Sequence, residues 1–539
     1  MDKPRGADAL ARAVSRAGVR NLFTLSGNHV MPLFDAALDA KLSLVHVRHE
    51  AAAVHMADAW ARITGETGVA LVTGGPGHAN AVSALYTAAM AESPVVLLSG
   101  HAPLGQAGMG AFQEMRQAEV AAPLAKASWV CRSAADVVPD FERAMRIARS
   151  GRPGPVHLSI PQDCLEAEVG EAGRAPPAQP PAGSAFDPGA FVDRLRRAQR
   201  PLVLTGPASL TRAGRSRIAS LEEALGIAVV GMESPRGIAD PSLGAFAQML
   251  ARADCVLLLG KRLDFTLRFG KAPAVSAECA FLQIDAEAAE LDRTRNAVGA
   301  RLEATAIAAL FDGIDALLGC AQQQPALRGS WRDEVRSAIA YRPAAWDVAV
   351  SSIPGRLHPV QALRPLQALL DEHPDAVLVS DGGEIGQWAQ ACLHSPTRVI
   401  NGVAGSIGAA LPFAAAASLA RPGAPVIAVM GDGTFGFHCA EIDTAVRYGL
   451  RFLLVVGNDA RWNAEYQIQV RDYGRERVTA TELLPTRYDQ VATGFGGYGE
   501  QVTEAGELLP AARRAMQSGR PACLNVMIEG LPAPDVRRR

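Results

Sequence analysis

Two groups of oxygen-bearing side chains toward the C-terminal end of the sequence have a spacing that suits metal chemistry. Residues 431–434, Gly-Asp-Gly-Thr, directly follow a short apolar run at 426–430, and Asn458 and Asp459 follow the next such run at 452–456. If both runs are neighbouring parallel strands, Asp432 and Asp459 meet at the sheet edge where α/β proteins bind ligands. Two oxygen side chains, a backbone carbonyl and phosphate oxygens form the shell that Mg²⁺ prefers. Gly and Asp are also common in ordinary turns, so residues 431–434 alone would not indicate a metal site. The oxygen side chains of Asn458 and Asp459 after the next run favour the metal interpretation.

The same glycines fit a second motif. Gly431, Gly433 and Gly436 match G-x-G-x-x-G after a strand, which is the pattern of dinucleotide-binding proteins. Asp432 would then place a carboxylate against a pyrophosphate, and the two charges repel each other unless a metal lies between them. The metal interpretation is therefore favoured. A helix is expected after this turn, at about 439–448, and its N-terminus would face a phosphate.

A further acidic residue lies in the N-terminal part of the chain. Glu50 comes after an apolar run at 43–47 and begins an Ala-rich helical segment at 51–63. A glutamate in a first helical turn is commonly there because the helix dipole favours it. At the carboxyl end of a strand, the same carboxylic acid can also serve in general acid–base catalysis.

The metal motif resembles the signature of the thiamine-diphosphate-dependent enzymes, in the group of acetolactate synthases, benzaldehyde lyase and 2-hydroxyacyl-CoA lyases. That signature is Gly-Asp-Gly, then 24–27 residues, then Asn-Asn, and here positions 434 to 457 separate Gly433 from Asn458. The resemblance implies thiamine diphosphate and Mg²⁺ as cofactors. It implies Asp432, Asp459 and the Arg461 backbone carbonyl as metal ligands. The family's second Asn is Asp459 here, so Asn458 stays an alternative ligand.

Other segments resemble the cofactor-binding loops of this family. Residues 403–408 look like the segment that grips the aminopyrimidine, in which Ile407 would force the cofactor into its bent conformation. Core packing of an Ala/Gly-rich helix is the alternative for that segment. Residues 381–384 resemble a loop on the diphosphate side. The cofactor-binding residues that the resemblance implies are Gly383, Glu384, Gly405, Ser406, Ile407, Gly431, Gly433, Thr434 and Trp462.

The resemblance also implies three catalytic residues. Glu50 fits the family's His-Glu-x-x-Ala pattern and would exchange a proton with pyrimidine N1′ of the cofactor. Gln113, in Ala-Phe-Gln-Glu at 111–114, resembles the Gln that lies near the substrate carbonyl in acetolactate synthases. His29 matches a His of benzaldehyde lyase and would shuttle a substrate proton; a surface or N-capping His is the alternative. Residues 73–77 look like the family's Gly-Pro-Gly turn.

The elements that must position these residues alternate between apolar runs and helical patterns. This rhythm predicts an α/β fold of three doubly wound parallel-sheet domains: pyrimidine-binding at 1–170, central at 186–325 and diphosphate-binding at 355–530. A Pro-, Ala- and Gly-rich linker at 171–188 and a polar interval at about 322–354 separate the three. The expected strands lie at 21–25, 43–47, 69–73, 95–99, 201–205, 227–230, 255–259, 281–284, 376–380, 399–401, 426–430 and 452–456.

Composition excludes several classes of function. The net charge of −2 over 539 residues gives no basic field for nucleic acid or an anionic membrane. The longest apolar run, at 409–420, is too short to span a bilayer. Eight cysteines without a C-x-x-C pair suggest reduced thiols, and the first residues lack a signal-peptide pattern, so a cytoplasmic location is expected. The central block shows no clear flavin pattern, so FAD is not expected.

The resemblance implies a carboligase or lyase that forms or cleaves a carbon–carbon bond next to a carbonyl. Its substrate would be a 2-keto acid or a 2-hydroxy-carbonyl compound. It would act as a homodimer or homotetramer, with active sites between subunits. The alternatives are a simple 2-keto acid decarboxylase and a non-catalytic cofactor-binding subunit, and Glu50 and Asp432 argue against the second.

Overall fold

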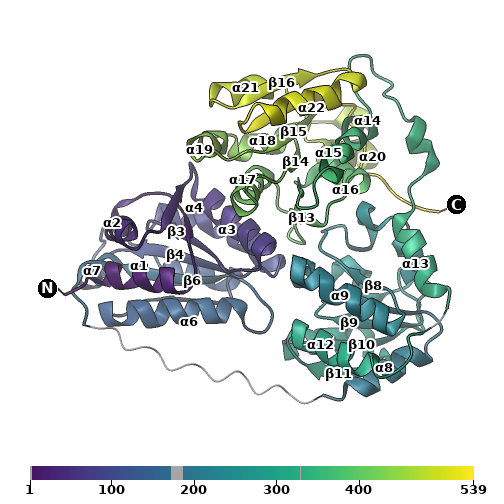
Figure 1. The fold of residues 1–539 in the computed structure, drawn as a ribbon, viewed down its shortest axis with the longest axis horizontal. Helices are drawn as coiled ribbons and strands as arrows, with labels where there is room; N and C mark the ends of the chain where they lie inside the picture. The colour runs from purple at the N-terminus through teal and green to yellow at the C-terminus, as the bar shows by residue number, and fades with distance from the viewer. Residues whose placement is uncertain (1–2, 171–185, 328, 539) are drawn as a thin grey trace.

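The computed structural model describes residues 3–170, 186–327 and 329–538. Within them the chain forms three parallel sheets, and helices cover both faces of each (Figure 1). This is the α/β architecture that the sequence predicts. Most of the predicted linker, at 171–185, lies outside the described residues.

The first sheet has six strands in the order β2-β1-β3-β4-β6-β5. They are β1 (Asn21–Thr24), β2 (Ser43–His46), β3 (Gly68–Val72), β4 (Val95–His101), β5 (Ala127–Val130) and β6 (Val156–Pro161). One face packs against α1 (Gly6–Arg16), α2 (Met31–Asp39) and α6 (Val137–Arg149), and the other against α3 (Glu50–Thr64) and α4 (Pro76–Met90). Two short helices complete this domain, α5 (Gln117–Ala121) and α7 (Gln162–Glu166).

The central sheet has five strands in the order β11-β10-β9-β7-β8. They are β7 (Pro201–Thr205), β8 (Val229–Gly231), β9 (Cys255–Leu259), β10 (Ala280–Asp285) and β11 (Leu302–Ile307). One face packs against α8 (Pro188–Arg197), α9 (Arg212–Leu225) and α12 (Leu310–Ala321). The other packs against α10 (Phe246–Leu250) and α13 (Trp331–Ala340), while α11 (Ala288–Val298) follows β10.

The third sheet has six strands in the order β13-β12-β14-β15-β17-β16. They are β12 (Val377–Ser380), β13 (Thr397–Ile400), β14 (Val426–Gly431), β15 (Leu453–Asn458), β16 (Tyr498–Val502) and β17 (Ala522–Met527). One face packs against α17 (Ala410–Ala420), α18 (Asp432–His438), α19 (Glu441–Arg447) and α21 (Tyr488–Gly494). The other packs against α14 (Pro359–Leu363), α15 (Gln367–Asp371), α16 (Gly383–Cys392) and α22 (Leu508–Gln517); α20 (Asn463–Tyr473) follows β15.

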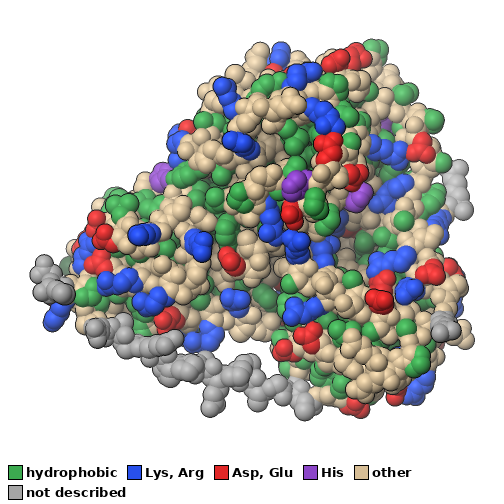
Figure 2. Space-filling model, viewed as in Figure 1, with side chains coloured by type: hydrophobic (Ala, Val, Ile, Leu, Met, Phe, Trp, Pro, Cys, Tyr) green, Lys and Arg blue, Asp and Glu red, His purple; other side chains and the backbone are tan. Residues whose placement is uncertain are grey.

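The first and third domains share one hydrophobic core. Helix α3 packs against α17, and buried residues of both sheets and of both helices belong to a single apolar cluster (Figure 1). The central domain instead has two clusters of its own, one on each face of its sheet. Figure 2 shows Lys and Arg side chains gathered where the three domains meet. Ion pairs cross this junction, among them Arg398 with Glu233 at 2.6 Å.

Two expectations differ from the structure. The helix expected at 439–448 is present as α19, but a further helix, α18, begins at Asp432, and a turn at Cys439 and Ala440 separates the two. An Asp in the first turn favours an early start, since its charge complements the helix dipole. The polar interval at 322–354 contains α13, where Trp331 Nε1 donates to the Pro201 carbonyl over 3.0 Å. Among the described residues, no helix combines the length and apolar character needed to cross a membrane.

Candidate active site

The residues predicted to carry the chemistry form two groups, each at the carboxyl edge of one sheet. In the first sheet, β1 pairs with both β2 and β3, so the connections run to opposite sides of β1 and leave a crevice at the strand ends. His29 follows β1, Glu50 follows β2 and Thr73 follows β3. The topology alone therefore brings these three side chains to one edge.

Glu50 is the first residue of α3 and is 8% exposed. Asn80 Nδ2 on α4 donates to Glu50 Oε2 over 3.0 Å. Gly77 gives room beside the other oxygen, because a Cβ at that position would lie 3.3 Å from Glu50 Oε1. Glu441 of α19 accepts the N–H groups of the two residues before Glu50, at 3.0 and 3.1 Å. The carboxylate is thus fixed by its backbone and by one hydrogen bond.

His29 is 1% exposed, so the surface alternative for this residue is wrong. Its Nδ1 lies 3.2 Å from Thr73 Oγ1, and its ring stacks on Phe112 with 6.1 Å between centroids. Burial lowers the pKa of His29 below its ordinary value. The imidazole is therefore neutral at pH 7, which is the form that can both accept and donate a proton.

Gln113 packs against residues 73–77, which connect β3 to α4 and include the first two residues of α4; this segment is called here the Gly75 turn. A Cβ on Gly75 would lie 2.7 Å from Gln113 Cβ, so this approach requires glycine. Gln113 itself has φ of 57°, a conformation that non-glycine residues rarely adopt. Since His29 contacts Thr73 and Glu50 lies beside Gly77, the Gly75 turn touches all three predicted catalytic residues.

The second group lies at the ends of β14 and β15, which pair with Gly431 opposite Gly457. Asp432 and Asp459 are 2% and 7% exposed. Burial raises the pKa of both carboxyls, and the charge of Asp432 raises that of Asp459 further. Asp432 Oδ2 is buried without a hydrogen-bond partner. Two buried carboxylates that repel each other, with one oxygen unsatisfied, fit a divalent cation.

Asn458 and Asp459 have different surroundings. The Asn458 amide donates to the carbonyl of Thr486 at 2.9 Å and to Asn525 Oδ1 at 3.0 Å, and its Oδ1 accepts the Ala460 N–H at 3.2 Å. Asn458 therefore shapes the loop through three hydrogen bonds. Asp459, by contrast, is the residue of the two whose pKa the charge of Asp432 raises.

The residues around this pair are packed closely. A Cβ on Gly433 would lie 2.8 Å from the Trp462 ring, so glycine is needed for the indole to cover the turn. Thr434 Oγ1 donates to the Gly431 carbonyl over 3.0 Å. The guanidinium of Arg461 lies 4.2 Å from the centroid of the Tyr466 ring.

Asp381, at the end of β12, organises the loop that carries Ile407. It is 1% exposed and accepts N–H groups from Gly408 at 2.9 Å and Ala410 at 3.2 Å. Burial raises the pKa of Asp381 to about 6. Ile407 packs on Gly382, where a Cβ would lie 2.7 Å from Ile407 Cγ2. The sequence analysis placed Asp381 in a loop on the diphosphate side without a role of its own. Its position directly after a strand could have indicated that role.

Two further predicted cofactor-binding residues, Ser406 and Glu384, contact neighbouring domains. Thr87 Oγ1 of α4 donates to Ser406 Oγ over 2.8 Å. Glu384 lies 3.7 Å from Arg236 of the central domain, and burial raises the pKa of Glu384. Both loops rely on glycines with positive φ, 74° at Gly383 and 68° at Gly405.

Within one chain, the two groups remain separate. Among the described residues, the side chains that contact Glu50 and His29 belong to the first domain. Those around Asp432 and Asp459 belong to the third domain.

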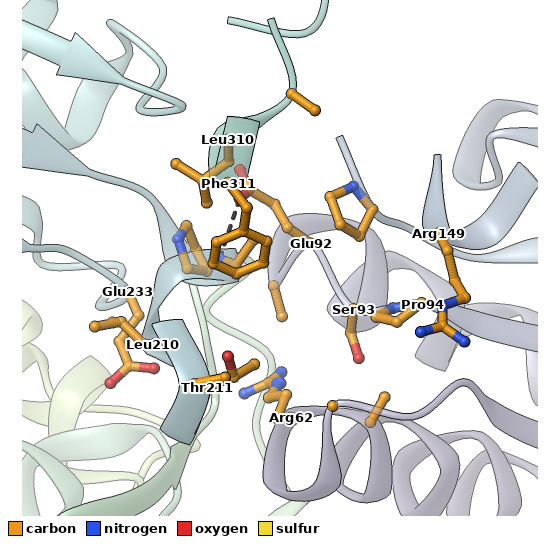
Figure 3. A pocket seen from close by; sticks show the side chains of 18 of the residues that line it. Arg62, Glu92, Ser93, Pro94, Arg149, Leu210, Thr211, Glu233, Leu310 and Phe311 are labelled. Carbon is orange, nitrogen blue, oxygen red and sulfur yellow. Dashed lines mark hydrogen bonds between the residues drawn. The ribbon is translucent and has the colours of Figure 1, made fainter. Parts of the chain in front are cut away.

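A separate cavity of about 350 Å³ is lined by residues of the first and central domains and by Arg398 and Gly402 of the third. Figure 3 shows Arg62, Glu92 and Arg149 from the first domain facing Thr211 and Phe311 from the central one. It is lined by none of the predicted site residues, and Glu92 closes one side by accepting the N–H of Ala208 over 3.2 Å.

Comparison with known proteins agrees with this geometry. Three family models match in chain order: the N-terminal binding domain of thiamine pyrophosphate enzymes at residues 4–120, their central domain at 189–310 and their C-terminal binding domain at 381–526. A probable acetolactate synthase of Mycobacterium bovis is 32% identical over 96% of this chain and 95% of its own length. Human 2-hydroxyacyl-CoA lyase 2 is 30% identical over 97% of this chain and 90% of its own.

These matches span the N-terminal edge that carries Glu50, the central sheet and the C-terminal edge that carries Asp432. Both relatives align along almost the whole chain, so the likeness covers the entire three-sheet architecture. The chain belongs to the thiamine pyrophosphate enzyme family, as a cofactor-dependent carboligase or lyase.

Proposed function

We propose that the protein uses thiamine diphosphate and Mg²⁺ to form or cleave a carbon–carbon bond in a 2-keto acid or a 2-hydroxy-carbonyl compound. The observation that carries this proposal is the buried Asp432 and Asp459 pair, with one carboxylate oxygen unsatisfied, at a strand edge of the third sheet. A cation there neutralises both charges and offers open positions to a diphosphate.

Asp432, Asp459 and the Arg461 carbonyl would hold the metal. Ile407, supported by Gly382 and by the loop that Asp381 fixes, is the apolar residue on which the cofactor would bend. The other residues proposed to contact the cofactor are Gly383, Glu384, Gly405, Ser406, Gly431, Gly433, Thr434 and Trp462.

Thiamine diphosphate, when bound, supplies the electron sink that carbon–carbon cleavage next to a carbonyl requires. Glu50 would hold and exchange the proton at pyrimidine N1′, with Asn80 fixing its other oxygen. His29 Nδ1 faces Thr73, so Nε2 is the nitrogen that would move a substrate proton. The Gln113 amide would orient the substrate oxygen.

We further propose that a homodimer, alone or paired into a homotetramer, is the active form, with each site between two chains. The separation of the two groups within one chain supports this proposal. Apolar side chains near both groups are exposed, with Phe112 at 68% and Phe437 at 52%. A partner chain would cover them and bring Glu50 to the cofactor. We also propose a cytoplasmic location. All eight cysteines are free thiols, which supports this location because cytosolic proteins keep their thiols reduced.

Products distinguish the reactions open to this site. The purified protein, with thiamine diphosphate and Mg²⁺, is incubated separately with pyruvate, benzoin and a 2-hydroxyacyl-CoA, and the products are read by mass spectrometry. Acetolactate indicates a synthase, and release of an aldehyde from either of the other two substrates indicates a lyase. Acetaldehyde from pyruvate indicates a simple decarboxylase. Cofactor binding without any product from a wider panel of 2-keto acids and 2-hydroxy-carbonyl compounds would overturn the proposal and leave a non-catalytic subunit.

A further inference from the structure

Gln117, the first residue of α5, has none of the roles assigned above, yet its side chain joins three strand ends. It has no exposed surface. Its Oε1 accepts the N–H of Gly75 over 2.8 Å, while Nε2 donates to the Gly100 carbonyl at 3.0 Å and to Ser159 Oγ at 2.8 Å. One amide therefore connects the Gly75 turn after β3 to β4 and β6.

The Gly75 N–H and the Gly100 carbonyl fix the orientation of this amide, and a buried chain of hydrogen bonds that continues from its Nε2 is consistent with that orientation. Ser159 Oγ accepts from Gln117, so its own proton faces His157 Nε2 at 3.2 Å. His157 then carries its proton on Nδ1, which lies 2.8 Å from Ser128 Oγ, and Ser128 donates to the Ala118 carbonyl. Burial lowers the pKa of His157, which keeps it neutral as this arrangement requires. Every donor finds an acceptor only when Gln117 Oε1 faces Gly75.

The backbone that Gln117 holds is unusual. Gly75 has φ of 58° and ψ of −115°, a conformation open only to glycine. It faces Gln113, which has φ of 57°, and the two backbones are so close that a Cβ on Gly75 would lie 2.8 Å from the Gln113 carbonyl oxygen. Such conformations persist only where surrounding contacts enforce them. The Gln117 hydrogen bond is a side-chain restraint that acts directly on the Gly75 peptide.

We propose that Gln117 is a positioning residue of the active site. By holding the Gly75 N–H, it fixes the conformation of the Gly75 turn. Gln113 packs on this turn, and Thr73 within it contacts His29. Helix α4, which continues from the turn, carries the Asn80 that donates to Glu50. Gln117 touches neither substrate nor cofactor and acts through these residues. This inference rests on the proposed function, because it assigns the positioning of the proposed catalytic groups.

The first test replaces Gln117 with Met, which has similar length and makes none of the three hydrogen bonds. A matched control is Ser128→Ala, which removes a buried hydrogen bond at the far end of the same network. We expect Gln117→Met to lower kcat by about 10- to 100-fold through misplaced reacting groups. The affinity for thiamine diphosphate should stay within about threefold of the original, because the residues proposed to hold its metal and diphosphate lie in the third domain. Ser128→Ala should leave kcat within about twofold.

The second test uses Gln117→Glu, which keeps the size of the side chain and remains informative if Gln117→Met fails to fold. An ionised Glu at this position can accept the Gly75 N–H, but it faces the Gly100 carbonyl without a proton to donate. A protonated carboxyl can make both bonds. The titratable groups around it are His78 of α4, His157 of β6 and His101 at the end of β4. The kcat of this variant relative to the original protein should therefore rise as pH falls from 8 to 6.

The outcomes separate this inference from the proposed function. Loss of kcat in Gln117→Met with cofactor affinity retained, or a ratio that rises with acidity in Gln117→Glu, supports the positioning role. The inference is overturned if Gln117→Met loses no more activity than Ser128→Ala, or if the Gln117→Glu ratio is independent of pH. Failure of the proposed function gives a different result, namely an original protein without turnover.

Discussion

The first and third sheets have the same strand order, with β1, β2, β3 and β4 matched by β12, β13, β14 and β15. In both, the predicted residues follow these four strands. The loops after the matched strands β3 and β14 are the Gly75 turn and the turn at Asp432. The loops after β4 and β15 carry Gln113 and Asp459.

The chemistry of the two edges is opposite. The third sheet buries two carboxylates whose pKa values rise, while the first buries the neutral His29, whose pKa falls, beside the single carboxylate Glu50. One scaffold thus presents a doubly acidic edge, where we propose the cation, and an edge with a neutral imidazole, where we propose proton transfer, according to which side chains follow the strands. Strand order fixes where a site lies, and residues at strand ends fix what it does.

The largest effect is expected for Glu50 of the first sheet, whose replacement should lower turnover without weakening cofactor binding. Glu50→Gln should lower kcat by about 10²- to 10⁴-fold, because the variant cannot exchange a proton at N1′. Hydrogen exchange at thiazolium C2, followed by NMR, should slow in parallel, while calorimetry should show nearly unchanged cofactor binding. Full turnover in Glu50→Gln would refute the division and the mechanism together.

The next largest effect concerns the proposed cation site at the edge of the third sheet. Asp432→Ala should weaken Mg²⁺-dependent binding of thiamine diphosphate by about 100-fold, because a ligand is lost. Asp459→Asn keeps an oxygen and removes the repulsion, so binding should change by less than about tenfold and the protein without cofactor should melt at a higher temperature. Equal losses in both variants would show that charge, rather than an oxygen ligand, is needed at position 459.

Ile407 connects the two edges, because it is the proposed support on which the cofactor bends toward Glu50. Ile407→Ala should lower kcat by about 10- to 100-fold with a smaller change in cofactor affinity. Asp381→Asn should act in the same direction, since the amide has one oxygen, and its NH2 group would face either the Gly382 N–H or the Ala410 N–H, both of which the carboxylate accepts. Steady-state kinetics with calorimetry measures both; a change in affinity alone would contradict this role.

The smallest effect tests a property that both domains share. Burial lowers the pKa of His78 in the first domain and of His438 in the third to about 4. Since the unfolded chain binds these protons more readily, stability falls as pH drops from about 6.5 toward 4, by about 2 kcal/mol per histidine at pH 5. Urea unfolding of His78→Asn between pH 7 and 5 should show a correspondingly smaller loss. An unchanged pH dependence would contradict the burial of His78 in its neutral form.

Most of the scaffold could be predicted from the sequence because buried parallel strands are short apolar runs, and β7 and β9 have the predicted bounds. Edge strands such as β11 and β16 were missed, since their half-buried residues form no such run. The spacing between Gly433 and Asn458 indicated which strand ends carry the proposed metal site. It could not show that Asn458 is hydrogen-bonded within the loop, because its partners are Asn525 of β17 and Thr486. The Gln117 network depends on three strand ends, and no local pattern reveals it.

The core shared by α3 and α17 also bears on how the chain folds. The first and third domains are far apart in sequence, yet neither can bury its helix layer until the other is present. Their assembly requires contacts of long sequence separation, which are slow to form. The central domain has its own cores and can collapse beforehand. A nascent chain would therefore expose the Ala-rich face of α3 until synthesis is nearly complete, and the first domain expressed alone should aggregate, while the central domain alone should fold.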